Sequence, residues 1–319
     1  MSSPMAKDRL VSHQGRVTVL GSANLDLIVR TARIPRPGET LTSHAIRHAP
    51  GGKGLNQAVA ASRAGASVRF VGAVGNNATG AQLAKYLQTN QIDTTDLATV
   101  TADSGTAIVM VDDNGENAIL VTPGANGAVT PLPSHPGRWL DTDVLLMQLE
   151  LPLSTIEMAT AEAARSAPTT RVVLNAAPAR RLPRDLLGNI DVLIVNEHEC
   201  RELTSNPELP EAARELAQNV AGLVVTLGAR GATWFERGHQ GGSITPPKVT
   251  PVDTTGAGDT FCGALAAELA AGASLETAIA FGVAASALST QQHGASDSAP
   301  HRQEVLGTME AGRHVQRAP

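Results

Sequence analysis

The chain has 319 residues and a hydrophobic content of 42%, which suffices for a sizeable core in one large α/β domain or two smaller ones. A net charge of -5 and an aromatic content of 2% argue against a nucleic-acid-binding protein, which needs basic patches and base-stacking side chains. No apolar run reaches the length of a transmembrane helix, and Cys200 and Cys262 lack paired or ligand-like spacing, so we expect a cytoplasmic protein with no membrane partner.

The N-terminal residues fall into two segments of different character. Residues 1–15 lack the apolar centre of a secretion signal, and we expect a flexible tail there. Residues 16–22 predict a buried strand, which is followed by Asn24 and Asp26. These two side chains would point to the same side of an extended chain and would suit hydrogen bonds to vicinal hydroxyls. The alternative is a turn in which both residues cap their own backbone.

Two segments alternate apolar and polar residues without a helical period, at 27–50 and 104–123. Within the second, "DDNGEN" at 112–117 separates two strand-like runs and predicts a hairpin turn. We expect antiparallel additions to a main sheet here. They form either a lid over a site or an ordinary edge extension of that sheet.

The stretch "PGGKGLNQ" at 50–57 opens an Ala-rich helix predicted over 55–65. Its glycines, Gly52 among them, permit close approach of a ligand to the backbone. Asn56 lies in the first helical turn, and Lys53 is either a ligand-binding cation or a solvated loop charge. The spacing matches neither a P-loop nor a dinucleotide-binding fingerprint.

Short apolar runs alternate along the chain with Ala-rich segments of helical length. This alternation predicts βαβ units and a mostly parallel sheet covered on both faces, with ligands beyond the carboxyl ends of the strands. The predicted buried strands span 16–22, 68–75, 144–150, 171–175, 191–196 and 223–228, and the predicted helices span 55–65, 80–90, 153–167 and 211–222.

Three later strand ends carry polar or glycine residues. Glu150 ends one strand, where a charge is also commonplace. Asn196 and Glu199 follow another, and they indicate either a ligand site or a helix capping box with Asn196 as the N-cap. The next strand ends in a tight turn that a ligand could approach, at Thr226, Gly228 and Gly231.

The stretch "DTTGAGDTFCG" at 253–263 places a bare turn before an apolar helix. The first N–H groups of a helix lack partners and converge at the positive end of its dipole, so the turn at Gly256, Ala257 and Gly258 predicts an anion site. Asp259 lies at the same point. An ionised carboxylate there suits the acceptance of a proton from a hydroxyl that attacks a phosphoryl group. A simple first-turn helix charge would explain Asp259 but not the glycines.

These motifs together resemble the ribokinase branch of the PfkB carbohydrate kinases, from about Arg16 to His301. The resemblance rests on "GSANLDLIVR", "IPRPGET", "PGGKGLNQAVAASRAGA", "LLMQLE", "LNAAPAR", "NEHE", "TLGARG" and "DTTGAGDTFCGAL", which follow one another in the family's order. It implies a ribokinase-like three-layer αβα sandwich with a mostly parallel central sheet over residues 16–305. A small β-sheet lid from about 27–50 and 104–123 and flexible tails at 1–15 and 306–319 complete the expected organisation.

By this resemblance the chain is expected to phosphorylate the primary 5-hydroxyl of D-ribose with ATP, giving D-ribose 5-phosphate and ADP. Asp259 would be the general base, and Gly256, Ala257 and Gly258 would form the anion hole. The residues expected to hold the sugar are Asn24, Asp26, Gly52, Lys53, Asn56 and Glu150. Those expected at the Mg²⁺-nucleotide, mainly through water, are Asn196 and Glu199, with Thr226, Gly228, Gly231 and Gly258 approaching the ATP.

The family further implies an activating K⁺ site and a homodimer formed by lid-on-lid packing. The matching cation positions, mostly acting through backbone carbonyls, are Asp253, Thr255, Ser289, Gln292, Gly294 and Ser298. Val283 departs from the family, which commonly carries a polar residue near the adenine, so we expect looser base specificity. The alternatives are a PfkB-family kinase for deoxyribose, a ketohexose or a nucleoside, and a sugar-binding paralogue without turnover.

Overall fold

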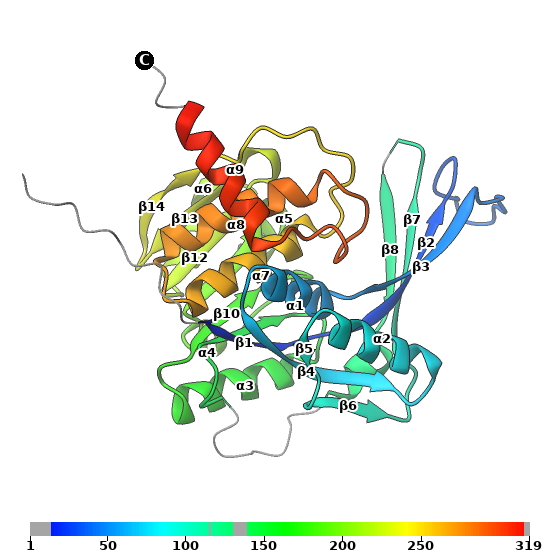
Figure 1. Ribbon diagram of the computed structural model, residues 1–319, viewed down its shortest axis with the longest axis horizontal. Helices are drawn as coiled ribbons and strands as arrows, with labels where there is room; N and C mark the ends of the chain where they lie inside the picture. Colours follow the sequence, from blue (N-terminus) through cyan, green and yellow to red (C-terminus); the bar gives the residue numbers. More distant parts are fainter. Residues whose placement is uncertain (1–13, 115, 130–138, 316–319) are drawn as a thin grey trace, which may run out of the picture.

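The computed structural model describes residues 14–114, 116–129 and 139–315, which build a large sheet, a small sheet and the helices around them (Figure 1). The six strands expected from the apolar runs form the parallel centre of the large sheet. In spatial order they are β12 (Gly222–Thr226), β11 (Val192–Asn196), β10 (Arg171–Asn175), β9 (Val144–Gln148), β1 (Arg16–Leu20) and β4 (Ser67–Gly75). Antiparallel β13 (Ala232–Glu236) and β14 (His239–Ile244) extend one edge, and β5 (Ile92–Asp93) and β6 (Leu97–Val100) pair with β4.

Helices cover both faces of the large sheet, which confirms the predicted three-layer architecture. One face carries α1 (Lys53–Arg63), α2 (Ala78–Thr89), α7 (Ala257–Ala270), α8 (Leu275–Ser289) and α9 (Arg302–Val315). The other face carries α3 (Leu153–Ser166), α4 (Arg184–Leu187), α5 (Glu197–Thr204) and α6 (Leu209–Ala217).

Strand β9 shows why the central strands are mostly apolar on both faces. Val144 and Leu146 belong to the core cluster beneath α1, α7 and α8, whereas Leu145 and Met147 belong to the cluster beneath α3 and α6. A strand covered on both faces has no polar side. Full burial of a side chain of this size stabilises the folded state by about 1.5–3 kcal/mol relative to leaving it exposed to water.

The small sheet is separate from the large one and consists of β3 (Ala45–Gly51), β2 (Asn24–Arg30), β7 (Gly105–Val111) and β8 (Asn117–Thr122), in that spatial order. It is therefore not an edge extension of the large sheet, and it is not wholly antiparallel as expected, because β2 and β7 pair in parallel. The backbone N–H of Asp112 donates to the carbonyl of Glu116 at 3.0 Å, and β7 pairs antiparallel with β8, as the predicted hairpin requires. Because β2 begins just after β1, the small sheet rises from the carboxyl edge of the large sheet (Figure 1).

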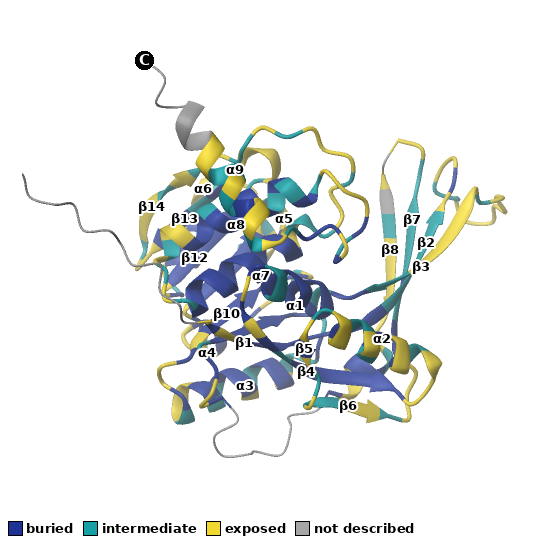
Figure 2. Cartoon of the chain, viewed as in Figure 1, coloured by how far each residue is buried: buried dark blue, intermediate teal, exposed yellow. Residues whose placement is uncertain are grey.

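The two faces of the small sheet meet different surroundings. Alternate residues of β7 and β8, including Ala107, Val109 and Ile119, line a cavity. The intervening residues point to the opposite side, which we call the outer face; it comprises Leu27, Val29, Ile46, Ile108, Met110 and Leu120. On this face Ile46 is 58% exposed and Leu120 is 63% exposed, and Figure 2 shows β3 and β8 as largely exposed strands.

The C-terminal segment differs from the flexible tail expected from residue 306. Helix α9 continues through Val315, and Leu306 and Met309 pack against the core cluster beneath α8. Their spacing, with Val305, is that of one apolar helical face. The tail expected at 1–15 lies outside the described residues, apart from Gln14 and Gly15.

Both cysteines, Cys200 on α5 and Cys262 on α7, are free and buried, in agreement with the absence of a disulfide framework. No helix in the described part of the chain combines the length and the apolar character that crossing a membrane requires.

Candidate active site

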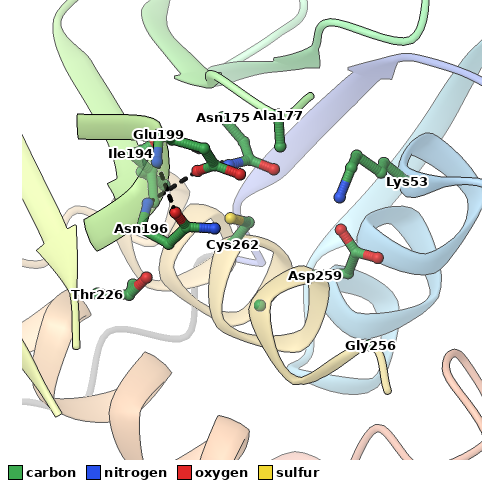
Figure 3. A pocket seen from close by; sticks show the side chains of 11 residues that line it. Lys53, Asn175, Ala177, Ile194, Asn196, Glu199, Thr226, Gly256, Asp259 and Cys262 are labelled. Carbon is green, nitrogen blue, oxygen red and sulfur yellow. Dashed lines mark hydrogen bonds between the residues drawn. The ribbon is translucent and has the colours of Figure 1, made fainter. Parts of the chain in front are cut away.

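Two adjoining cavities open at the carboxyl edge of the large sheet. The larger cavity, of about 720 Å³, lies between the small sheet and the N-termini of α1 and α7. The smaller cavity, of about 140 Å³, lies over the ends of β10, β11 and β12. Lys53, Gly256 and Asp259 line both cavities and therefore mark the point at which they meet (Figure 3).

The turn before α7 presents backbone rather than side chains to this junction. Gly256 is the N-cap of α7 with a φ of 76°, a conformation that favours glycine. The space that a side chain at Gly258 would occupy contains no protein atom within 4 Å. The first N–H groups of α7 have no acceptor within the helix, as the predicted anion site requires, although the N–H of Ala257 donates to the carbonyl of Thr254 at 3.2 Å.

Asp259, in the first turn of α7, is held by two side-chain amides although it is only 8% exposed. Asn56 Nδ2 donates to its Oδ2 at 3.0 Å, and Gln57 Nε2 donates to its Oδ1 at 3.0 Å. A buried carboxylate is costly unless it is hydrogen-bonded. Both amides come from the first turns of α1, the helix that packs against α7.

Lys53, at the start of α1, places its ammonium group beside Asp259 (Figure 3). The charge of Asp259 raises the pKa of Lys53; burial opposes this rise, and the charges of Glu150 and Glu199 add to it. Lys53 was expected in the sugar pocket alone. It lines both cavities, and its positive charge therefore lies where an anion and an alcohol could meet.

Asn24 and Asp26 both line the larger cavity from β2. The Oδ1 atom of Asn24 accepts a hydrogen bond from Asn126 Nδ2 at 2.7 Å, and Asn126 Oδ1 accepts from the backbone N–H of Ala23 at 3.0 Å. This clamp directs the amide nitrogen of Asn24 away from Asn126. The Asn24 side chain is therefore hydrogen-bonded to Asn126 and does not cap its own backbone, which was the alternative considered from the sequence.

Asp26 carries an unusual protonation equilibrium. Burial raises its pKa to about 7, and the nearby charges of Glu150 and Asp259 act in the same direction. Its Oδ1 atom is buried without a hydrogen-bond partner. An unpartnered carboxyl oxygen in the wall of a cavity is a group that a ligand hydroxyl can satisfy.

Glu150 joins the end of β9 to the start of α1. Its Oε2 atom accepts hydrogen bonds from the Ser22 hydroxyl at 2.5 Å and from the backbone N–H of Lys53 at 3.0 Å. Glu150 also lines the larger cavity. It therefore fixes the glycine-rich stretch before α1 as well as presenting a carboxylate to the cavity.

Asn196 and Glu199 form a complete capping box at the start of α5. The Asn196 side chain accepts from the backbone N–H of Glu199 at 2.8 Å, and the Glu199 side chain accepts from that of Asn196 at 2.8 Å. Both residues also line the smaller cavity, so capping and a ligand site coexist (Figure 3). Burial is the main cause of a raised pKa at Glu199.

The remaining residues expected around the nucleotide divide into two groups. Thr226 lines the smaller cavity, as does Gly258. Gly228 and Gly231 bound the short 3₁₀ turn η2 (Gly228–Arg230) just beyond β12 and are not part of the cavity wall. Val283, on α8, is buried within the hydrophobic cluster, which gives its apolar side chain a packing role.

Within the described residues, no group of three or more His, Cys, Asp or Glu side chains is arranged to hold a metal ion. Glu199 and Asn196 fit a different mode of binding. The capping box leaves Asn196 Nδ2 and Glu199 Oε1 without a partner in it. Both residues line the smaller cavity, and Glu199 contributes the one carboxylate of the pair. This set suits Mg²⁺ that arrives with a nucleotide and keeps its waters.

Asp253 links the turn before α7 to the loop after α8. Its carboxylate accepts hydrogen bonds from the backbone N–H of Thr255 at 2.9 Å and of Gly294 at 3.0 Å. Burial alone would raise the pKa of Asp253, but a hydrogen bond from the Thr255 side chain, together with the two backbone hydrogen bonds, outweighs burial and holds the pKa below its usual value. Of the other expected cation positions, Ser289 and Ser298 are buried and donate to the carbonyls of Ser286 and Ala295, and Gln292 is exposed.

Four polar residues that we did not single out support the site. Asn126 holds Asn24, whereas Gln57, Gln148 and Asn175 form a buried chain of amides that reaches Asp259. One signal was available in the sequence: Gln148 and Asn175 are polar last residues that directly follow the apolar runs of β9 and β10.

Comparison with known proteins places the chain among sugar kinases. The family of pfkB family carbohydrate kinases matches residues 14–302. The chain is 38% identical over 303 residues to a ribokinase of Haemophilus influenzae, covering 92% of this chain and 98% of that protein. It is 32% identical over 294 residues to a deoxyribokinase of Salmonella typhi, covering 89% and 95% respectively.

The same relationship holds in three dimensions. The structure of Arabidopsis thaliana ribokinase complexed with ribose and ATP superposes with a TM-score of 0.85 at 30% sequence identity, covering 93% of this chain and 99% of the other.

The raised pKa of Asp26 predicts a pH-dependent stability. Between the ordinary value of 3.8 and about 7, the folded protein keeps a proton that the unfolded chain releases. The free energy of unfolding should therefore fall as pH rises through this window, by up to about 4 kcal/mol from this group. Asp26→Asn removes this titrating group, so the variant should gain thermal stability relative to the parent at pH 8 but not at pH 4. An equal difference in melting temperature between Asp26→Asn and the parent at pH 4 and at pH 8 would contradict this prediction.

Proposed function

Because the chain belongs to the pfkB family of carbohydrate kinases, we propose that it is an ATP-dependent ribokinase that converts D-ribose to D-ribose 5-phosphate. One observation carries the proposal: Lys53, Gly256 and Asp259 stand between a polar cavity under the small sheet and a second cavity at the capping box of α5. A base, a cation and a bare helix N-terminus at one junction are what phosphoryl transfer to an alcohol needs.

The larger cavity is the acceptor site in this proposal. Asn24 and Asp26 bind vicinal hydroxyls of the sugar, with further contacts from Gly52, Lys53, Asn56 and Glu150. The unpartnered Oδ1 of Asp26 and the unpartnered Oδ1 of Asn56 support this assignment, because both are buried oxygen atoms of cavity-lining residues that lack a donor. The primary 5-hydroxyl then lies at Asp259.

The chemical step follows from the junction. Asp259 accepts the proton of the 5-hydroxyl as that oxygen attacks the γ-phosphorus of ATP. The bond from the γ-phosphorus to the bridging oxygen breaks, and its electron pair leaves with ADP. The N–H groups of Gly256, Ala257 and Gly258, together with Lys53, stabilise the negative charge on the transferred group.

The smaller cavity receives the phosphate end of the nucleotide. Asn196 and Glu199 hold the hydrated Mg²⁺ of Mg²⁺-ATP, and Thr226 contacts the phosphates, with Gly228 and Gly231 farther out along the nucleotide. When bound, Mg²⁺ neutralises charge on the phosphates. A cytoplasmic location, where ATP is available, agrees with two free, buried cysteines.

Deoxyribose is the rival substrate that a specific observation favours, because one relative that covers most of the chain is a deoxyribokinase. A sugar-binding paralogue without turnover is disfavoured, since Asp259 and the turn before α7 are present and supported by hydrogen bonds.

The substrate assignment is tested by measuring ADP release with D-ribose, 2-deoxy-D-ribose, D-fructose and adenosine. We expect the highest kcat/KM for D-ribose, because Asn24 and Asp26 together suit vicinal hydroxyls. Asp259→Asn is the matched control: it should lower kcat about 10²- to 10⁴-fold while leaving ATP binding intact. A higher kcat/KM for another acceptor would reassign the substrate, and near-normal turnover of Asp259→Asn would remove the base from the mechanism.

We also propose that a monovalent cation, K⁺ in the cell, binds where Asp253 and Thr255 face the loop of Ser289, Gln292, Gly294 and Ser298. The support is that Asp253 already bridges these two segments and is held ionised by its hydrogen bonds. Bound cation would steady the turn that forms the anion hole.

Activity should therefore rise about fivefold or more when K⁺ replaces tetramethylammonium at constant ionic strength. Asp253→Asn should abolish most of this response without changing the acceptor preference. Equal rates in the two salts would argue against a cation site.

The outer face of the small sheet supports a third proposal, a homodimer in which two lids pack together. This face carries largely exposed Ile46 and Leu120, and pairing would remove them from water. Such packing would also hold the small sheet over the larger cavity.

Leu120→Glu should therefore shift the protein from dimer to monomer in sedimentation experiments, because it places a charge in the buried centre of the interface. The control is Leu140→Glu, at a similarly exposed leucine outside the small sheet, which should leave the dimer unchanged. A monomeric parent protein, or equal effects of both variants, would refute lid-mediated assembly.

A further inference from the structure

The carboxylate of Asp259 receives amides from two consecutive residues of α1, only one of which faces the acceptor cavity. Asn56 lines the larger cavity and donates to Oδ2. Gln57 donates to Oδ1, is 0% exposed and belongs to the walls of neither cavity. Its contact with Asp259 therefore serves the carboxylate and not a ligand.

The orientation of Gln57 is fixed by its other neighbours. Its Oε1 accepts from Gln148 Nε2 at 2.7 Å, and its Nε2 also donates to Asn175 Oδ1 at 3.1 Å. An ionised carboxylate can only accept, so the nitrogen of Gln57 must face Asp259 and the oxygen must face Gln148. Asn175 Nδ2 in turn donates to the carbonyl of Ile194 at 3.3 Å.

This chain of amides connects Asp259 on α7 to three strands of the large sheet. Gln148 ends β9, Asn175 ends β10, and Ile194 lies in β11. The turn before α7 is by contrast a loop segment. The amide chain thus gives the carboxylate a position relative to the rigid sheet that its own helix terminus does not provide.

Packing alone does not account for these amides. Gln148 is also 0% exposed, and its Oε1 has no hydrogen-bond partner, an arrangement that costs about 1–3 kcal/mol relative to a satisfied group. A Cβ at Gly21 would lie 2.3 Å from that oxygen, so the end of β1 leaves room for it. An apolar side chain at position 148 would avoid this cost. The hydrogen bond from Gln57 to Asp259, at the end of this chain, explains why polar residues occupy these buried positions.

We propose that Gln57 is a positioning residue for phosphoryl transfer. It holds the Asp259 carboxylate in the orientation in which one oxygen accepts the proton of the acceptor hydroxyl, and Gln148 keeps the donor end of Gln57 directed at Asp259. The proposal rests on the role of Asp259 as the base, and it holds for whichever alcohol the enzyme phosphorylates.

Gln57→Met tests it, because methionine has a similar volume and cannot donate. With the preferred acceptor of the parent enzyme, kcat should fall about 10²-fold, while KM for acceptor and for ATP stays within about threefold. Gln148→Met, one step farther from Asp259, should show a smaller loss of about tenfold. Val59→Ala, a cavity-forming change at a buried apolar position of the same helix, is the control for structural damage. It should lower the melting temperature and leave kcat unchanged.

A double-mutant cycle separates positioning from any independent effect. In the Asp259→Asn background, Gln57→Met should cause no further loss of the residual activity, because Gln57 acts through Asp259. The same fractional loss in both backgrounds, or a normal kcat for folded Gln57→Met, overturns the proposal. Should Gln57→Met not fold, a normal kcat for Gln148→Met overturns it instead. A parent enzyme that phosphorylates no alcohol would refute the proposed function, which is a distinct result.

Discussion

The burial of one carboxylate, that of Asp259, is the constraint on which the arrangement of the site depends. An ion removed from water needs compensating hydrogen bonds and charge. Here the compensation comes from the N-terminus of α7 and from Lys53, Asn56 and Gln57 on α1. The two helices must therefore lie very close together, and Gly263 on α7 permits this, because a Cβ there would lie 2.3 Å from the carbonyl oxygen of Gln57.

The two sheets divide the work around that carboxylate. The small sheet brings Asn24 and Asp26 to the larger cavity, and the large sheet brings the ends of β10, β11 and β12 to the smaller cavity. Both sets of residues follow apolar strands whose ends are rigid. The small sheet starts from the end of β1 and leads through β3 into α1, so it is connected directly to Lys53, which lines both cavities.

Several residues serve the fold and the site at once. Glu150 anchors the start of α1 and faces the larger cavity, and Asn196 and Glu199 cap α5 while facing the smaller cavity. Structural and catalytic explanations of such residues are not alternatives. A residue that caps a helix is held in one rotamer by the cap, which is the preorganisation that a binding site needs.

The layered α/β fold could be predicted from the sequence alone, because the central strands are mostly apolar on both faces, and so could the position of Asp259 behind a bare turn. The hairpin at 112–117 and the capping box at Asn196 likewise agree with local patterns of alternation and spacing, whereas alternation alone left a lid and an edge extension of the main sheet open. Two features required the three-dimensional structure: Lys53 lines both cavities, and Gln57, Gln148 and Asn175 form one chain of hydrogen bonds that ends at Asp259. Those contacts join residues from α1, β9, β10 and α7, which lie far apart in the sequence. Local sequence spacing does not predict these contacts, because they arise from the order of the strands in the sheet and from the close packing of α1 against α7.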